Sequence, residues 1–387
     1  MKMGKTFWNI WTSYAMFYFG RVNLSMVIPV ILATYGDLSL YNVGFVASGF
    51  MATYALGQFL HGQLSERFNP FVYMAIGLLG SAAMNCILGF SAGFFLMLLI
   101  GEMLDGGFQS MGWSSAVRAN AYTSSDIEKS ATVLGTAYQV GNSLAWVVCA
   151  FVIGQFGWQW GFWVATIVMA IRGVVLLGTL PKFEFKPKML KERVKLTLSF
   201  PIIVAALSLC LLNMIRYGVI TWIPTYLFRE FSMPIEKVGF NIFLIPIFGV
   251  LGTLLYNKIK LPRDLSTIIY LSILGVVLVF LPETQGVPML LLLLASGFFL
   301  YGPHVFLVTT LPSRFHAQSI VAAAAGFIDG WGYVGSIAIG IVVPFMLTSL
   351  GMEWAAVFYF WAIIAFVAVA LVSVAYLKSK GVKQIGT

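Results

Sequence analysis

Two arginines lie inside long apolar runs of the sequence, where a charge is costly. Arg21 is in the middle of the first run, and Arg216 is in the middle of the run that opens the second half. Each is followed eight residues later by a proline, Pro29 and Pro224. Even lenient insertion scales assign about 2.5–3.5 kcal/mol to an arginine at the centre of a bilayer, and a guanidinium cannot be discharged. Two such residues at matched positions predict an anion-binding site.

A pair of guanidinium groups has a defined binding chemistry. Each presents several donors in a fixed fork that matches the oxygens of phosphate or carboxylate, and a hydrogen bond to a charged group contributes about 1.5–3 kcal/mol. We expect Arg21 and Arg216 to face each other across a watered cavity and to clamp a tetrahedral or planar oxyanion. The alternative is a structural ion pair with one of the acids in the apolar runs, Glu102, Asp105 and Asp329.

Two tyrosines share the helical face of the first arginine. Tyr14 and Tyr18 precede Arg21 by seven and three residues, which places them two turns and one turn away on the same side of a helix. Their hydroxyl groups can donate to the same anion. The same spacing also fits side-chain packing or an aromatic belt at the membrane interface, so lining of the cavity is one of two interpretations.

The composition fixes the class of protein. Of the 387 residues, 60% are hydrophobic and 10% charged, and the mean hydropathy is +0.91. A soluble core cannot absorb this much apolar surface, so we predict an all-α polytopic membrane protein. Its three cysteines lie inside the apolar runs without histidine neighbours. The sequence therefore predicts no metal site, no cofactor and no catalytic residue, and we expect no enzyme activity.

Apolar runs broken by charged residues, proline or glycine predict twelve transmembrane helices. They lie near residues 7–34, 43–64, 71–91, 94–117, 130–155, 158–180, 197–228, 237–257, 265–282, 287–311, 317–347 and 352–377. The one long polar stretch between them divides the chain into six plus six helices. We therefore predict an N-terminal six-helix bundle over 1–180, a cytoplasmic linker over 181–196 and a C-terminal six-helix bundle over 197–387.

The two halves are predicted to be pseudo-symmetric repeats. The arginine and proline of the first span recur with the same spacing about 195 residues later, as expected of transporters built from parallel repeats. Nearly all Lys and Arg outside the spans fall on one side of the membrane, and only Arg229 and Lys237 fall on the other. The positive-inside rule then places both termini and the linker in the cytoplasm. This bias explains the net charge of +9 without a nucleic-acid partner, and we expect the lipid bilayer of the cell (plasma) membrane as the surroundings.

Several stretches of the chain carry a family resemblance. They are Arg21 with VNLSMVIP after it, GQLSERFNP (62–70), FQSMGWSSAVR (108–118), RYGVITWIPTYL (216–227), YGP (301–303) and AAGFIDGWGYVGS (324–336). Together they resemble the organophosphate:phosphate antiporter family of the major facilitator superfamily, and the likeness runs over nearly the whole chain. RYGVITWIPTYL is the most specific of them, whereas GQLSERFNP is a general signature of the superfamily.

The resemblance implies a site. In that family, which includes glycerol-3-phosphate and hexose-phosphate carriers, the arginines that match Arg21 and Arg216 bind the phosphate. The matching also places tyrosines of the family's pocket on Tyr14, Tyr18, Tyr54 and Tyr333.

The chain departs from the glycerol-3-phosphate carrier at three positions of this site. Gln58 stands in place of a lysine, Tyr138 in place of a histidine, and Asn213 in place of the tyrosine that precedes the second arginine. The pocket thereby loses a cation and a titratable imidazole, so a less highly charged ligand is compatible with it. The identity of the substrate does not transfer from the family.

The remaining charged residues of the spans have open interpretations. Asp329, among the glycines of the eleventh span, is either a proton acceptor, a contact to substrate hydroxyl or amino groups, a partner of Arg216, or a residue of a water-filled crevice. For Glu102 and Asp105 we expect an ion pair with Arg172, which is structural or part of a gate.

We therefore expect a secondary active transporter, a monomer that works by rocking its two bundles around a site near the membrane midplane. It would exchange a small organic phosphate, or a related organic anion, for inorganic phosphate. Two alternatives stay open: a proton-coupled symporter of carboxylates or other organic anions that uses Asp329 or Glu102, and an organophosphate receptor that does not transport.

Overall fold

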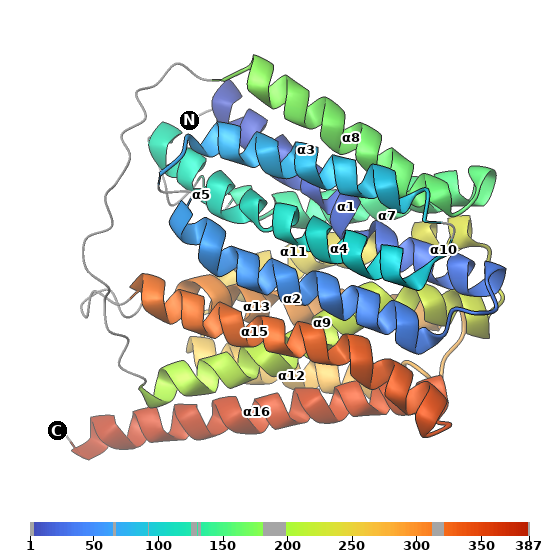
Figure 1. Ribbon diagram of the computed structural model, residues 1–387. Helices are drawn as coiled ribbons and strands as arrows, with labels where there is room; N and C mark the ends of the chain where they lie inside the picture. The colour runs from blue at the N-terminus through green and yellow to red at the C-terminus, as the bar shows by residue number, and fades with distance from the viewer. Residues whose placement is uncertain are drawn as a thin grey trace. The chain divides into compact units, whose positions relative to one another are not determined.

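The computed structural model describes residues 4–64, 67–91, 93–124, 130, 133–180, 199–311 and 321–385, so the predicted linker over 181–196 lies outside the described residues. Helices and their connecting turns make up this part of the chain (Figure 1). The helices up to the long polar stretch are α1 (Lys5–Thr34), α2 (Leu40–Leu64), α3 (Pro70–Leu88), α4 (Phe95–Gln109), α5 (Met111–Thr123), α7 (Ala137–Phe156) and α8 (Gln159–Gly178). Those after it are α9 (Phe200–Glu230), α10 (Ile235–Ile242), α11 (Leu244–Lys258), α12 (Arg263–Phe280), α13 (Gly286–Val305), α15 (Val321–Pro344) and α16 (Trp354–Ile385), with π-helical turns η1 (Phe306–Thr310) and η3 (Phe345–Ser349).

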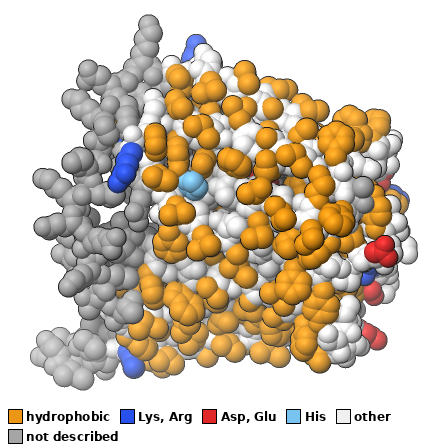
Figure 2. Space-filling model, viewed as in Figure 1, with side chains coloured by type: hydrophobic (Ala, Val, Ile, Leu, Met, Phe, Trp, Pro, Cys, Tyr) orange, Lys and Arg blue, Asp and Glu red, His pale blue; other side chains and the backbone are white. Residues whose placement is uncertain are grey.

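The described helices confirm the predicted all-α membrane fold. Eleven stretches in the described residues are long and apolar enough to cross a bilayer. Figure 2 shows apolar side chains over most of the visible surface, where a soluble protein would carry charges. The protein is therefore a multi-pass membrane protein.

Two predicted spans are each divided at a single residue, 94–117 into α4 and α5 at Ser110 and 237–257 into α10 and α11 at Phe243. Of the two, 94–117 is the one that is not among the eleven stretches of the described residues. The break falls at Ser110, whose hydroxyl donates to the carbonyl oxygen of Gly107 at 2.6 Å. The backbone of Ser110 keeps a right-handed helical conformation, and its amide donates to the carbonyl oxygen of Gly106 at 3.1 Å, so the interruption is slight. The polar composition of α5 also makes it a poor membrane span by itself, which the count of apolar residues over 94–117 did not reveal.

Local sequence signals account for several helix ends. Asn69 caps α3 by accepting a hydrogen bond from the amide of Phe71 at 3.0 Å, and Pro70 occupies the first helical position, where no amide donor is needed. Gly157 ends α7 with a φ of +97°, which glycine adopts without strain, and the chain turns directly into α8.

The chain forms two compact units. The first contains Met1–Lys191 and Ile220–Phe243, and the second contains Glu192–Val219 and Leu244–Thr387. Helix α9 therefore contributes to both. Because the sequence assigns residues 220–243 to the second half, the two divisions differ there, and the six-plus-six division stays a prediction.

In the first unit, small residues let helices approach closely. Helix α1 packs on α7 and α8, α2 on α4, and α3 on α8. A Cβ atom added to Gly141 of α7 would lie 2.2 Å from the carbonyl oxygen of Ala15, and one added to Gly106 of α4 would lie 2.4 Å from that of Phe50. These glycines allow backbone-to-backbone contact, which is how membrane helices pack without a hydrophobic effect between them.

Glycines also allow close packing of helices in the second unit. Helix α11 packs on α13, and α12 on α16 and α13. A Cβ atom on Gly252 of α11 would lie 1.9 Å from the carbonyl oxygen of Phe298, and one on Gly335 of α15 would lie 2.0 Å from that of Cys210 in α9. The second contact seats α15 against the part of α9 that carries Arg216.

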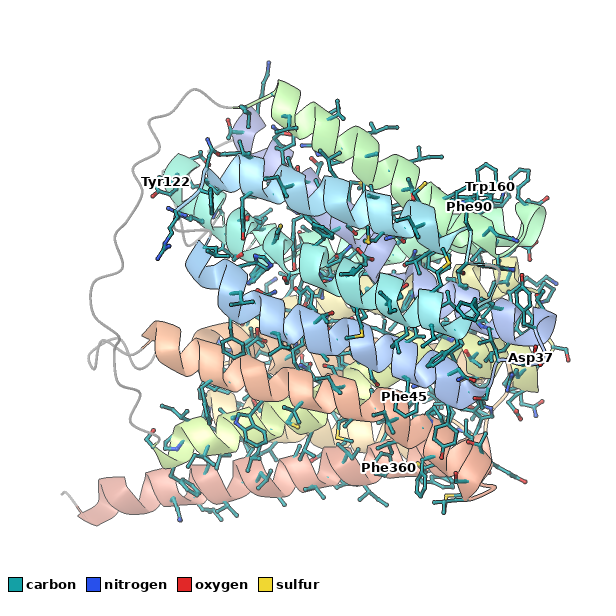
Figure 3. All side chains as sticks on the ribbon, in the orientation of Figure 1. Asp37, Phe45, Phe90, Tyr122, Trp160 and Phe360 are labelled. Carbon is teal, nitrogen blue, oxygen red and sulfur yellow. The ribbon has the colours of Figure 1, made fainter. Side chains whose placement is uncertain are left out.

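Aromatic side chains gather at one end of the first unit. The ring of Trp163 lies 5.2 Å from that of Phe90 and 5.7 Å from that of Trp160. In Figure 3, Phe90 and Trp160 lie at the same end of the unit as Asp37, and Tyr122 lies at the opposite end. Such clusters are typical of the membrane–water interface, so they mark where the apolar slab ends.

Candidate functional site

Arg21 lies deep in the first unit and is held by hydrogen bonds from two directions. Its side chain is 9% exposed. One terminal nitrogen donates to the hydroxyl of Tyr18 at 3.1 Å, and the other donates to Oε1 of Gln109 at 3.2 Å. Both acceptors are neutral, so these bonds orient the guanidinium without cancelling its charge.

Two tyrosine rings flank this guanidinium. The Arg21 Cζ atom lies 4.4 Å from the ring centroid of Tyr54 in α2 and 4.7 Å from that of Tyr18. A cation over the face of an aromatic ring is attracted by the ring quadrupole, by about 0.5–2 kcal/mol. The hydroxyl of Tyr54 in turn accepts a hydrogen bond from Nε2 of Gln58 at 2.6 Å.

The other tyrosines predicted for this half join the same cluster. The ring of Tyr18 lies 6.0 Å from that of Tyr14 and 6.0 Å from that of Tyr138 in α7. Tyr14 also contacts Trp113 of α5, with ring centroids 4.9 Å apart. The structure thus brings together the predicted site residues of the first unit, which are Arg21, Tyr14, Tyr18, Tyr54, Gln58 and Tyr138.

Behind the guanidinium, Gln109 connects three helices. Its Nε2 atom donates to the carbonyl oxygen of Phe17 at 3.0 Å and to the hydroxyl of Ser81 at 2.8 Å. Ser81 in turn donates to Asp105, which also accepts from Asn85 at 2.9 Å. Asp105 is fully buried and close enough to Arg21 for the two charges to attract each other. The carboxylate therefore supports the site from behind a layer of neutral polar groups.

The predicted ion pair of Arg172 with Glu102 or Asp105 is wrong. Arg172 of α8 donates to the hydroxyl of Ser13 at 2.9 Å, and to the carbonyl oxygen of Asn9 at 2.7 Å as well as to its side chain. Asp105 bonds to Ser81 and Asn85, and Glu102 lies buried near it. Neutral oxygens of α1 satisfy the guanidinium, so it needs no acidic partner there.

Arg216 occupies a comparable place in the second unit. It is 6% exposed, and its Cζ atom lies 4.9 Å from the ring centroid of Tyr217 and 5.6 Å from that of Tyr301 in α13. His304 and Asp329 both lie close enough to interact with its charge. Each unit therefore contains a buried arginine between tyrosine rings.

The other predicted residues of this unit lie on α9 and α15. Asn213 precedes Arg216 by three residues on α9 and is buried. A Cβ atom added to Gly332 of α15 would lie 2.7 Å from its Nδ2 atom. Tyr333, next to that glycine, is half-buried one turn after Asp329. Asp329 lies close enough to Arg216 for the two charges to attract each other, which is compatible with each of its interpretations.

Sequence reasoning missed several residues of the two clusters. Gln109, Ser81 and Asn85 hold the first arginine from behind, and Tyr217 and Tyr301 flank the second. A signal was available for Gln109 and Tyr301, because they lie in the FQSMGW and YGP stretches that carry the family resemblance. Within the part of the chain described here, no group of three His, Cys, Asp or Glu side chains could hold a metal ion.

Comparison with known proteins identifies the family. Residues 10–340 match the family model of the Major Facilitator Superfamily. The chain belongs to this superfamily. As a superfamily member, the protein is a membrane transporter rather than an enzyme.

The relatives of this superfamily member confirm the resemblance to the organophosphate:phosphate antiporter family. The membrane sensor protein UhpC of Escherichia coli is 26% identical over 86% of this chain and 83% of its own. A probable hexose phosphate transport protein of Chlamydia trachomatis is 24% identical over 95% and 89%, and the glycerol-3-phosphate transporter of Bacillus subtilis is 25% identical over 86% and 83%.

Proposed function

We propose that the protein exchanges a small organic phosphate, or a related organic anion, for inorganic phosphate across the cell membrane. The observation that carries this proposal is the buried Arg21 guanidinium, oriented by neutral acceptors and set between two tyrosine rings. An ionisable residue inside a membrane helix marks a functional site by default, and a guanidinium with its charge available favours an anion there. Relatives named for glycerol phosphate and hexose phosphate transport support phosphate esters as the substrate class.

In this proposal the guanidinium supplies paired donors to two oxygens of the phosphate group, in the fork geometry that lysine lacks. The Tyr18 hydroxyl accepts a hydrogen bond from Arg21 and keeps its own proton to donate to a third oxygen. Arg216, between Tyr217 and Tyr301, is the corresponding contribution of the second unit. Tyr14, Tyr54, Tyr138 and Tyr333 complete the proposed lining, together with Gln58, Asn213 and Asp329.

The proposed transport cycle is alternating access by two pseudo-symmetric halves, with both termini in the cytoplasm and the protein acting as a monomer. Burial of each guanidinium is costly, and a bound anion offsets that cost. The loaded carrier therefore reorients more readily than the empty one, which favours exchange of one anion for another.

Purified protein in phosphate-loaded proteoliposomes tests the proposal. Uptake of labelled glycerol 3-phosphate should depend on internal phosphate. Arg21→Lys and Arg216→Lys should each lower the exchange rate by about tenfold or more, because a point charge replaces the bidentate fork. Arg229→Lys, at an exposed position outside the stretches that carry the family resemblance, serves as the matched control and should keep the native rate. Near-normal exchange by both lysine variants would contradict direct binding of phosphate.

A second candidate function is sensing without transport, favoured by the likeness to the membrane sensor protein. It predicts that phosphate esters bind to the purified protein but that no anion crosses proteoliposomes under any gradient. The same vesicles test the carboxylate symporter, because uptake driven by external acid without internal phosphate would favour it over exchange.

A further inference from the structure

Helix α7 buries polar side chains that the proposed phosphate site does not use. Asn142 is 2% exposed, and neither its Nδ2 nor its Oδ1 atom has a hydrogen-bond partner within the residues that the structure describes. The same holds for Nε2 of Gln139 and for the hydroxyl of Ser143, each 3% exposed. Three neighbouring polar residues of one apolar helix thus have side-chain atoms without bonds to the described part of the protein.

Such an arrangement is costly unless another molecule supplies the bonds. Leaving a buried donor or acceptor unsatisfied costs about 1–3 kcal/mol, and Asn142 has both kinds of group. An alanine or leucine at this position would avoid the cost and suit a membrane helix better. The amide is therefore more readily explained as a group that meets a polar ligand than as a packing residue.

The helical register places Asn142 opposite the stretch of α1 that carries Arg21. Tyr138, Asn142 and Trp146 follow one another at intervals of four residues along one side of α7. The first contacts the ring of Tyr18 at 6.0 Å, and Nε1 of the last donates to the hydroxyl of Ser25 at 3.1 Å. Asn142 lies midway between these two contacts, and Arg21 lies between Tyr18 and Ser25.

The two helices also touch each other at a point six residues before Arg21 on α1. The backbone of Gly141, the residue before Asn142, touches that of Ala15. Side chains at the edge of this contact are therefore within the length of a small ligand from one another. Asn142 and Arg21 are in the same unit, so this juxtaposition belongs to a single compact body.

We propose that Asn142 determines specificity by hydrogen-bonding the organic part of the substrate, and that this part carries a hydroxyl group near the phosphate. The inference rests on the proposed function, since it assumes that the phosphate lies at Arg21. A hydroxyl both donates and accepts, so it can satisfy Oδ1 and Nδ2 together. A carboxylate can only accept and leaves Oδ1 unpaired, and a hydrocarbon chain satisfies neither atom.

Matched pairs of phosphate esters test the assignment in phosphate-loaded proteoliposomes. Glycerol 3-phosphate is compared with propyl phosphate, and glucose 6-phosphate with tetrahydropyranylmethyl phosphate, each as the ratio of initial exchange rates. The native protein should prefer the hydroxylated member of at least one pair by about tenfold or more, the effect of hydrogen bonds to a buried amide. Asn142→Ala and Asn142→Leu should lower this ratio to about threefold or less. Leu144→Ala, on the exposed face of the same helix, should keep the native ratio.

The outcomes separate this inference from the proposed function. Self-exchange of phosphate by the native protein tests the proposed function alone, because phosphate has no organic part. If self-exchange occurs but the native protein shows no preference, or the Asn142 variants keep it, the specificity role is overturned. If a variant does not transport, binding of each ester to the purified variant is measured as the increase in Tm. The increases for the two members of a pair are then compared. Retention of the native difference there would also overturn the role.

Discussion

At the scale of single residues, the central feature is a guanidinium aimed by neutral groups. Tyr18 and Gln109 fix the direction of Arg21, while the carboxylate of Asp105 stays behind Ser81 and Asn85. A carboxylate in direct contact would compete with any incoming anion. An amide positions the cation equally well and leaves its charge available.

This reasoning predicts the effect of placing a carboxylate at that position. Gln109→Glu puts a fixed negative group next to Arg21, so phosphate must displace it before binding. We expect the KM for phosphate to rise by about tenfold or more, with a smaller change in kcat. The measurement is phosphate self-exchange over a range of concentrations. Gln285→Glu, at an exposed position, is the control, and an unchanged KM for Gln109→Glu would show that Gln109 does not position the cation.

The spacing of residues along one helix predicted the contacts within α1, but it could not predict the contacts between α1 and other helices. Tyr18 and Arg21 are three residues apart on one helix, so their contact follows from the sequence. Gln109 is 88 residues from Arg21, and no spacing rule connects them. The Arg172 prediction went wrong for a related reason. It looked for an opposite charge, whereas the side chain and carbonyl of Asn9 and the hydroxyl of Ser13 satisfy that guanidinium.

At the scale of helices, close backbone contact between α2 and α4 determines how the site is assembled. Gly106 of α4 lies against the carbonyl oxygen of Phe50 of α2. Phe50 lies one turn before Tyr54 on α2, and Gly106 lies three residues before Gln109 on α4. The contact therefore sets the distance between the helix that supplies a flanking ring and the helix that supplies the orienting amide.

Two adjacent glycines allow a matched test of this contact. Gly106→Ala places a methyl group 2.4 Å from the Phe50 carbonyl oxygen, so α2 or α4 must shift. We expect a loss of about 1–3 kcal/mol in stability and a lower Tm in detergent. Gly107→Ala meets no atom within 4 Å and gains helix propensity, so its Tm should stay at or above the native value. Equal Tm values for the two variants would show that the contact is not tight.

The helices themselves were largely predictable, because apolar runs of membrane length leave few alternatives. The division into α4 and α5 was not predicted, because it involves the single residue Ser110, whose backbone stays helical. A count of apolar residues over 94–117 averages the apolar α4 with the more polar α5.

At the scale of the whole molecule, the repeated element is a buried arginine between tyrosine rings, once in each compact unit. The sequence predicted the matched arginines from their common spacing to a proline, but not the tyrosine rings of Tyr217 and Tyr301 around the second arginine. It placed the boundary between halves at the polar linker, whereas compactness assigns Ile220–Phe243 to the first unit. A boundary drawn along the chain and one drawn from spatial proximity need not coincide, because α9 is 31 residues long and contributes residues to both units.

Two buried cations predict a constraint on transport as a whole. Without an anion the empty carrier must reorient with both guanidinium groups desolvated, which raises the barrier to that step. We therefore expect efflux of labelled phosphate from proteoliposomes to be at least about tenfold faster with external phosphate than without it. Equal rates in the two conditions would indicate a uniporter and would contradict exchange.

The position of Gln109 has a mechanical consequence. It is the last residue of α4, and its side chain accepts a hydrogen bond from Arg21 and donates one to the backbone carbonyl of Phe17. When a bound anion shifts the guanidinium, we expect the movement to pass through this amide to the backbone of α1 and to the end of α4. The Gln109 amide would then take part both in recognition of the substrate and in the first movement of the transport cycle.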